Sequence, residues 1–392
     1  MLWVPKLATG GLAPLTVLLG LVGALMGRRS KDRAALLAGL VGAGITANYI
    51  TRVTASHEQF DHTFGSAWRA RITPRQQARM LQQRYSGLLP QVAEPRWQRN
   101  LPYCTLPDGR ELLCDLWQPP VDVRPSGLAM IYTHGGGWCY CTKDFRTRAF
   151  FRHLAAQGHV VMDIDYRLAP KARLTEMLHD VKHAIGWMKT HAEAYGVNPE
   201  RIVLAGGSAG AHLSLLAAYT PNHPELDPPD AGADTSVRAV VAYYPPVDIH
   251  GLYYYGQTMY DERYIIKPVI TWLLKFAKLM QPEDTFISPV ELMVALVGGK
   301  PEDVPERYAL ASPLNHLGDH CPPTLLLHGQ HDCLVPVEHS RILRNALLNY
   351  AVDVALVEYP NSDHGFDLTF PELSPSAQAS FYDVERFLAL MV

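Results

Sequence analysis

The 392-residue sequence predicts an α/β fold, with a mostly parallel central sheet covered by helices on both faces. From about residue 128 onward, short continuous runs of apolar residues alternate with segments of helical pattern, as in parallel sheets. Several of these runs end in glycine-rich or polar loops, which would gather at the carboxyl edge of the sheet, where α/β folds place their sites. A content of 48% hydrophobic and 19% charged residues is sufficient for a large buried core.

The expected elements can be placed in chain order. A hairpin from Cys104 to Trp117, turning at Pro107–Arg110, begins the sheet. The strands that follow are expected at Leu128–Thr133, Val160–Ile164, Arg201–Ala205, Ala239–Tyr243, Thr324–His328 and Asp353–Glu358. The helices are expected near Leu174–Tyr195, from about Ala209, and over Ala377–Val392.

The chain divides into three regions. Residues 1–55 are an apolar N-terminal segment, and residues 56–95 are a polar, Arg/Gln-rich helical connector that could also help to cover a site at the sheet edge. Residues 96–392 form the main domain. Within it, residues of about 249–310 follow a strand as a long insertion, and we expect them to form a helical cap.

Two apolar runs, Leu7–Met26 and Ala34–Ile50, flank the basic segment Arg28–Arg33. Each approaches the roughly 20 residues that a membrane-spanning helix needs, and we favour a membrane hairpin. One span plus one surface helix, or a signal peptide in the first run, are the alternatives. If both runs span, the basic loop stays in the cytoplasm and the main domain lies on the non-cytoplasmic side.

Charge and cysteine content exclude other classes of function. A net charge of −3 and the absence of a long basic stripe argue against nucleic acid as a partner and favour a neutral or apolar small molecule. The six cysteines lack zinc-ligand spacing and so do not form a metal signature. Cys104 and Cys114 flank the hairpin turn, where a disulfide is a hypothesis, and the role of the pair Cys139 and Cys141 is open.

Gly206–Gly210, with the sequence Gly-Gly-Ser-Ala-Gly, follows an apolar strand and precedes a helix. That context favours a nucleophile elbow, in which small neighbours let Ser208 hold a strained backbone with an exposed hydroxyl. Taken alone, the motif could equally be a glycine-rich turn or a phosphate loop.

A second glycine motif, His134–Trp138, ends the strand Leu128–Thr133. Glycine peptides can approach a developing oxyanion without side-chain obstruction, so we predict an oxyanion hole from the N–H groups of Gly135, Gly136 and Ala209. A flexible glycine turn is the alternative, although it leaves the flanking His and Trp unexplained.

Asp332 and His364 each lie on a loop after a later apolar strand. Asp332 alone would be interpreted as a turn residue, and His364 is one of 17 histidines. Together with Ser208, however, they complete the chain order Ser, Asp, His that follows an elbow. We therefore predict Ser208 as nucleophile, His364 as its base and Asp332 as the residue that orients the base. Acyl transfer by these residues needs neither a metal nor an organic cofactor.

These motifs together resemble the hormone-sensitive-lipase-like carboxylesterases of the α/β-hydrolase fold, which include bacterial esterases and arylacetamide deacetylase. The resemblance covers roughly residues 101–392 and rests on a set of motifs in family order: His134–Trp138, Asp165–Pro170, Gly206–Gly210, Ser312–Pro313, Asp332 and His364. It implies hydrolysis of carboxylic esters with modest acyl chains beneath a helical cap. Two N-terminal apolar runs depart from the single span of arylacetamide deacetylase.

The resemblance leaves several alternatives open. An amidase or deacetylase of arylformamidase type would use the same residues, and a non-catalytic ligand-binding protein could share the fold. Trp138, Tyr140 and residues of Val269–Met280 are candidate walls of the substrate pocket. Asp165 and Arg167 are expected to form a structural charge pair beside the site, and Asp180 is also assigned a structural role.

Overall fold

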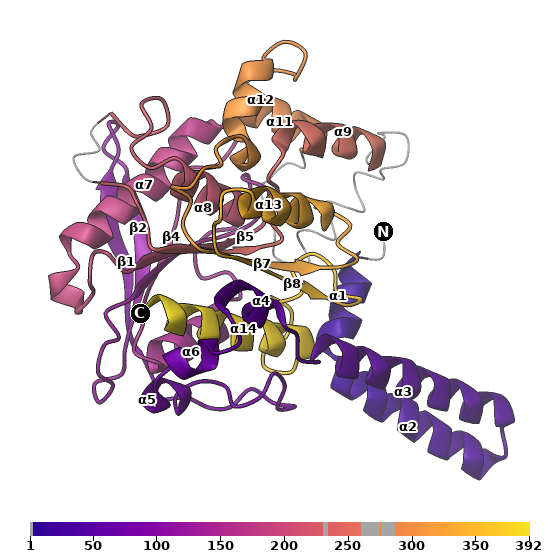
Figure 1. Ribbon diagram of the computed structural model, residues 1–392. Helices are drawn as coiled ribbons and strands as arrows, with labels where there is room; N and C mark the ends of the chain where they lie inside the picture. The colour runs from indigo at the N-terminus through magenta and orange to yellow at the C-terminus, as the bar shows by residue number, and fades with distance from the viewer. Residues whose placement is uncertain (1–2, 230–233, 260–274, 276–286) are drawn as a thin grey trace.

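The computed structural model describes residues 3–229, 234–259, 275 and 287–392 (Figure 1). Its centre is an eight-stranded sheet with the order β1-β2-β4-β3-β5-β6-β7-β8. β1 and β2 pair antiparallel, β2 pairs antiparallel with β4, and the remaining pairs are parallel. The strands are β1 Arg96–Thr105, β2 Glu111–Gln118, β3 Ala129–Thr133, β4 Val160–Ile164, β5 Ile202–Gly207, β6 Ala239–Tyr243, β7 Thr324–Gly329 and β8 Val354–Tyr359.

Helices cover both faces of this sheet (Figure 1). One face carries α7 Leu174–Thr190, α8 Ala209–Tyr219 and α13 Glu338–Leu348, with η2 Glu193–Tyr195 and η3 Pro313–Asn315 nearby in the chain. The other face carries α6 Arg148–Ala156 and α14 Pro375–Met391. Because the central strands are buried on both sides, they need continuous apolar sequence, and the strands predicted from such runs are confirmed to within a residue or two.

The register of the sheet brings the two glycine motifs together. Thr133, the last residue of β3, pairs with Gly206 near the end of β5. His134 and Ser208 therefore leave the sheet at the same level of its carboxyl edge, although they are 74 residues apart in the chain.

The hairpin of β1 and β2 corrects one prediction. Register shifts between Gln98 and Leu101 and between Pro102 and Cys104 place Cys104 opposite Leu112, and Cys114 opposite Leu101. Cys104 and Cys114 are therefore not cross-strand neighbours, and the Cys104–Cys114 disulfide was a wrong prediction. Cys114 is a buried free thiol, and burial raises its pKa to about 12.

The N-terminal apolar segment forms three helices: α1 Trp3–Gly11, α2 Ala13–Ser30 and α3 Arg33–Val53. The first apolar run was predicted as one continuous helix, but it bends by 83° between α1 and α2. α2 and α3 then form an antiparallel hairpin that projects from the body of the molecule (Figure 1). Asp32 in the connecting turn caps α3 by accepting hydrogen bonds from the backbone N–H groups of Ala34 and Ala35.

Small residues line the seam between α2 and α3. A Cβ atom on Gly20 would lie 2.8 Å from the carbonyl oxygen of Gly39, and one on Gly39 would lie 2.5 Å from the nitrogen of Ala24. Ala24 and Ala43 are buried in the same seam. The two backbones can approach this closely only because these positions carry small side chains, an arrangement common between membrane helices.

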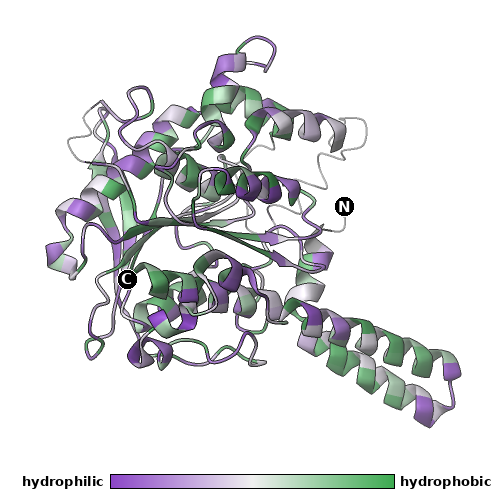
Figure 2. Ribbon diagram, in the orientation of Figure 1, coloured by the Kyte–Doolittle hydropathy of each residue, from purple (hydrophilic) through white to green (hydrophobic). Residues whose placement is uncertain are grey.

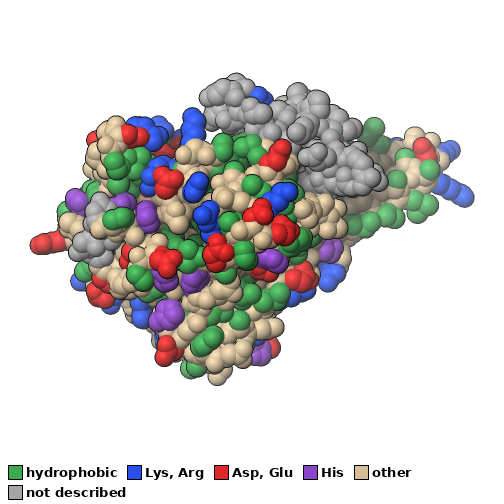
Figure 3. Space-filling model, turned by 90° about the horizontal axis from the view of Figure 1, so that it is seen from above, with side chains coloured by type: hydrophobic (Ala, Val, Ile, Leu, Met, Phe, Trp, Pro, Cys, Tyr) green, Lys and Arg blue, Asp and Glu red, His purple; other side chains and the backbone are tan. Residues whose placement is uncertain are grey.

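Large apolar side chains cover the outside of this hairpin. Leu19 is 68% exposed and Ile45 is 66% exposed. Figures 2 and 3 show hydrophobic residues along the hairpin, and Figure 3 shows Lys and Arg at its tip. By length and composition α3 could cross a membrane, and α1 with α2 could form a second, bent span.

The connector, residues 56–95, contains α4 Gln59–Phe64, η1 Trp68–Arg71 and α5 Pro74–Gln77. Its Phe60 and Trp68 are buried in the core cluster that includes Phe381 and Phe387 of α14. Its backbone is also tied to α14, because Leu81 N–H donates to Glu385 at 2.7 Å. The segment we expected to help cover the site instead packs on the face of the sheet opposite the inserted helices (Figure 1).

The expected cap insertion, residues 249–310, contains α9 Ile249–Met259, α11 Pro289–Val297 and the start of α12 Pro305–Ala311. These helices lie above the sheet on the side of α8 and α13 (Figure 1). Except for Lys275, the candidate wall segment Val269–Met280 lies outside the described residues.

Candidate active site

Ser208 lies at the turn from β5 into α8 with backbone angles φ 54° and ψ −119°. A non-glycine residue rarely adopts a positive φ, so the surrounding structure must hold this strained turn. Glycines beside it allow the close packing that does so. A Cβ atom on Gly206 would lie 2.7 Å from the carbonyl oxygen of Thr133, and one on Gly210 would overlap the same oxygen. The elbow glycines are therefore needed where α8 begins against the end of β3.

The first glycine of the His134–Trp138 motif lies directly beside Ser208. A Cβ atom on Gly135 would be 3.6 Å from the Cβ of Ser208 and 2.9 Å from the carbonyl oxygen of Gly207. Ala209 is fully buried at the start of α8, where the first N–H groups lack acceptors within the helix. Gly135 thus lies beside Ser208, and Ala209 follows it at the start of α8.

Gly136 has a φ of 111°, a conformation that favours glycine. Its carbonyl oxygen accepts hydrogen bonds from the N–H groups of Cys139 and Tyr140, at 3.2 and 2.9 Å. A Cβ atom here would overlap the carbonyl oxygen of Tyr140 and lie 3.0 Å from Cys141 Sγ. The loop is therefore closed by backbone hydrogen bonds and has no room for a side chain at this position.

Trp138 and Tyr140, both predicted as pocket walls, have different surroundings. Trp138 is only 4% exposed, and its indole N–H donates to His212 Nδ1 at 3.2 Å. His212 Nε2 then donates to the carbonyl oxygen of Ala311, and burial lowers the pKa of His212 to about 4, so the ring is neutral. This chain of contacts ties the glycine loop to α8 and α12.

Tyr140 is half-buried, and its hydroxyl accepts a hydrogen bond from the N–H of Ile287 at 3.2 Å. Gly137 lies under α11 of the insertion, since a Cβ atom on Gly137 would be 3.5 Å from Leu292. The glycine loop therefore lies beneath the inserted segment.

The structure joins Asp332 and His364, which are 32 residues apart, by a hydrogen bond of 2.8 Å from His364 Nδ1 to Asp332 Oδ2. The other carboxylate oxygen of Asp332 accepts hydrogen bonds from the N–H groups of Leu334 and Val335, at 2.9 and 2.8 Å. Burial opposes ionisation of Asp332, but electrostatic interaction and hydrogen bonds with His364 and His328 lower its pKa below the usual range. An ionised Asp332 can orient the His364 ring.

His328, at the end of β7, also contacts Asp332, with its Nε2 3.3 Å from the carboxylate. It is fully buried and bonded to Ser340 Oγ at 2.7 Å. Sequence reasoning missed this residue. The available signal was the spacing His328-x-x-x-Asp332 across the end of an apolar strand.

Tyr244 packs against both the elbow and His364. Its ring centroid is 4.4 Å from that of His364, and its hydroxyl would be 3.1 Å from a Cβ atom on Gly207. The hydroxyl donates to the buried Asp367 at 2.6 Å. Burial raises the pKa of Asp367 to about 6. Tyr244 thus contacts both the His364 ring and the glycine before Ser208. Sequence reasoning also missed this tyrosine, which directly follows the strand predicted at Ala239–Tyr243.

The expected charge pair of Asp165 with Arg167 is wrong. Arg167 pairs instead with Asp180, at 2.6 Å, and with Glu176, at 3.0 Å. Asp165 accepts a hydrogen bond from the backbone N–H of Lys143 at 2.7 Å. The arginine can reach α7 because that helix packs directly against the loop, which adjacency in sequence does not reveal.

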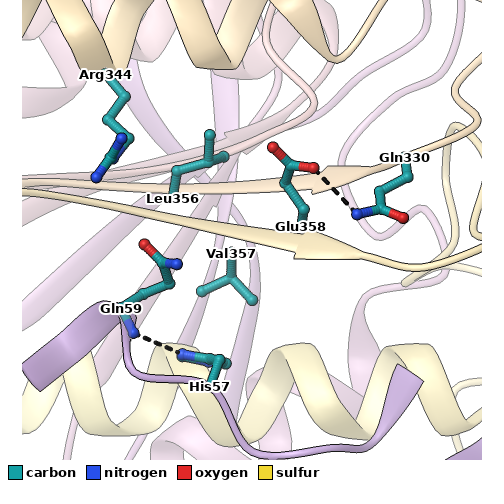
Figure 4. A pocket seen from close by; sticks show the side chains of 7 residues that line it. All are labelled: His57, Gln59, Gln330, Arg344, Leu356, Val357 and Glu358. Atoms are coloured by element: carbon teal, nitrogen blue, oxygen red, sulfur yellow. Dashed lines mark hydrogen bonds between the residues drawn. The ribbon is translucent and has the colours of Figure 1, made fainter. Parts of the chain in front are cut away.

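A surface pocket lies elsewhere, against the edge strand β8 (Figure 4). Hydrogen bonds join Gln330 to Glu358 at 3.2 Å and the N–H of Gln59 to His57 at 3.3 Å. The pocket is lined by His57, Gln59, Gln330, Arg344, Leu356, Val357 and Glu358. It shares no residue with the candidate site. Among the described residues, no cluster of His, Cys, Asp and Glu could hold a metal ion.

Known proteins resemble this chain in sequence and in fold. The BD-FAE family profile matches residues 114–347. Two Mycobacterium tuberculosis proteins, "Probable carboxylic ester hydrolase LipM" and "Esterase LipQ", are each 32% identical to it, over 72% and 73% of this chain and 58% and 62% of their own lengths. The chain thus spans about three fifths of these curated relatives.

A solved structure, Thermogutta terrifontis esterase 2 phosphoramylated by tabun, shares the fold with a TM-score of 0.56 at 23% identity. The match covers 76% of this chain and 95% of the esterase.

Proposed function

Because this chain belongs to the BD-FAE family, within the hormone-sensitive-lipase-like carboxylesterases of the α/β-hydrolase fold, we propose that it is a serine carboxylic-ester hydrolase. The observation that carries the proposal is the 2.8 Å hydrogen bond between Asp332 and His364. Tyr244 contacts both His364 and the glycine before the strained Ser208, which supports placing the base at the serine. Its substrates are small to medium, apolar esters, since the charge balance offers no strong field for an ionic substrate.

The mechanism follows from the roles of these groups. His364 Nδ1 donates to Asp332, which leaves Nε2 to take the Ser208 proton as the hydroxyl attacks the ester carbonyl. The N–H groups of Gly135, Gly136 and Ala209 stabilise the oxyanion. The alcohol leaves with a proton from His364, and water then attacks the acyl-enzyme with His364 again as base.

A direct test uses p-nitrophenyl esters of increasing acyl length with the purified full chain. We expect wild-type turnover, and at least about 10³-fold less in Ser208→Ala, because the nucleophile is lost. Covalent labelling by a fluorophosphonate should disappear in the same variant. Equal turnover by Ser208→Ala would refute the proposal.

Ester and amide hydrolysis share this machinery, so a matched pair of substrates must separate them. An aryl acetate and the corresponding aryl acetamide differ only at the leaving atom. We expect kcat/KM to favour the ester, and a preference for the amide would assign the chain to the deacetylase alternative.

We also propose that the hairpin of α2 and α3 anchors the enzyme in a membrane, with residues 96–392 as the catalytic domain and residues 249–310 as its cap. The exposed leucines and isoleucine outside the small-residue seam support insertion into lipid. The four basic residues Arg28, Arg29, Lys31 and Arg33 at the tip favour a cytoplasmic tip and a non-cytoplasmic catalytic domain.

Two measurements test the anchor. The full chain should stay in the membrane fraction after alkaline carbonate washing, and release into the supernatant would contradict an integral hairpin. Protease added to the non-cytoplasmic side of sealed vesicles should digest the catalytic domain. Protection of that domain would reverse the proposed orientation.

A further inference from the structure

α1 does not join the hairpin of α2 and α3 but lies on the catalytic edge of the sheet (Figure 1). Lys6 Nζ donates to Asp363 Oδ2 at 2.9 Å and to the carbonyl oxygen of His331 at 3.3 Å. These two acceptors are the residues directly before His364 and Asp332. One side chain from the N-terminal segment thus contacts both loops that carry the proposed base and its partner.

Asp363 joins those two loops to each other. Its Oδ1 accepts hydrogen bonds from the backbone N–H of His364 at 2.8 Å and from that of Cys333 at 3.0 Å. The Asp363 side chain is only 4% exposed, whereas that of Lys6 is 34% exposed. A carboxylate buried this deeply needs a partner for its charge, and Lys6 supplies one from outside the loops.

Apolar and backbone contacts seat α1 on the same edge. A Cβ atom on Gly365 would lie 4.0 Å from Leu7 Cδ1. A Cβ atom on Gly11 would lie 2.7 Å from the carbonyl oxygen of Thr369, so the end of α1 rests directly on the backbone beyond His364. On its other side, Gly10 lies under the hydroxyl of Tyr49 in α3, at 3.4 Å from a Cβ atom. α1 therefore lies between the catalytic loops and the base of the hairpin.

We propose that α1 is a positioning element of the active site and that Lys6, acting through Asp363, is a positioning residue for His364. The membrane hairpin and the catalytic loops are thereby mechanically joined, and full turnover requires α1 in its seat. This inference rests on the proposed esterase function. Lys6 itself does not touch the reacting atoms, so its loss should slow the chemical step without weakening substrate binding.

Lys6→Met tests the ion pair in the purified full chain, because it keeps the length of the side chain and removes its charge. We expect kcat to fall about tenfold with KM within about twofold of wild type, since small displacements of catalytic groups cost rate. Lys6→Arg should recover most of kcat. The matched control is Lys31→Met at the exposed hairpin tip, which should leave both constants unchanged.

Gly11→Leu tests the seat of α1 without touching the ion pair. The new side chain would collide with the Thr369 backbone, so α1 should lift and kcat should fall as in Lys6→Met. Gly23→Leu is its control, because nothing lies within 4 Å of a Cβ atom there. Hydrogen–deuterium exchange should be faster in both test variants at the N–H groups of Cys333 and His364, a result that does not depend on activity.

Three results would overturn the inference: unchanged kcat and unchanged exchange in Lys6→Met, equal losses in Lys6→Met and Lys6→Arg, or losses that only follow a lower melting temperature. Failure of the proposed function would be recognised separately, because the wild type itself would then lack turnover dependent on Ser208. In that case the positioning role proposed for Lys6 would be refuted together with the esterase function.

Discussion

The catalytic body and the N-terminal hairpin distribute their apolar residues in opposite ways. In the body, leucines such as Leu204 and Leu326 are fully buried between sheet and helices. In the hairpin, Leu19 is 68% exposed while Ala24 and Ala43 are buried in the seam. Burial of large side chains drives folding in water, whereas close backbone contact drives helix pairing in lipid. The two distributions support the proposal that the hairpin lies in lipid while the body folds in water.

The largest contrast should come from the same substitution in each region. Leu326→Ala leaves a cavity in the sheet core and should reduce the free energy of unfolding by about 3 kcal/mol. Leu19→Ala removes a side chain that contacts no protein core and should change it by less than about 0.5 kcal/mol. Denaturant unfolding of the purified chain in detergent measures both. Similar losses would mean that the hairpin packs like the body.

A charge on the outside of the hairpin should oppose insertion. Leu19→Arg places a charged group in the bilayer at a cost of about 2.5–3.5 kcal/mol, so less protein should resist carbonate extraction. Leu348→Arg, at a leucine on α13 that is 49% exposed, is the control on the body and should leave membrane retention unchanged. Equal behaviour of the two variants would contradict a lipid-facing surface on α2.

Substituting glycines inside and outside the seam tests how closely α2 and α3 pack. In Gly39→Leu the side chain meets the backbone of Ala24, so the helices must separate at a cost of about 1–3 kcal/mol. Gly42→Leu, with open space around its Cβ position, should be tolerated. Limited proteolysis at the hairpin turn reports the difference, and equal cleavage of the two variants would refute a packed seam.

The smallest expected effect concerns a charge that the body buries. Burial raises the pKa of Glu385 from 4.5 to about 7. The folded state therefore holds this proton more tightly than the unfolded chain, and the resulting stability is complete below about pH 4.5 and lost as pH rises through 7. Glu385→Gln should stabilise the protein at pH 8 by about 1 kcal/mol and flatten this dependence. Thermal unfolding between pH 5 and pH 8 checks it, and a steeper dependence in the variant would contradict it.

Most of the fold could be predicted from local pattern. Continuous apolar strands, glycine turns and the order of Ser208, Asp332 and His364 are properties of short segments, and the structure places each at the expected edge of the sheet. Predictions of which residues contact each other were less accurate. Arg167 bonds to Asp180 rather than Asp165, and Cys104 faces Leu112 because bulges shift the register of β1. Such pairings depend on how elements pack, which periodicity does not encode.

The sequence by itself determined the elements, the chemistry of the proposed triad and the presence of an apolar N-terminal segment, because propensity, hydrophobic period and motif spacing act over a few residues. Only the tertiary structure decided which face of that segment is inside, that Tyr244 contacts both His364 and Gly207, and that Lys6 reaches Asp363. The last contact joins residues 357 positions apart. Contacts over such separations arise when the whole chain packs, so no local pattern can specify them.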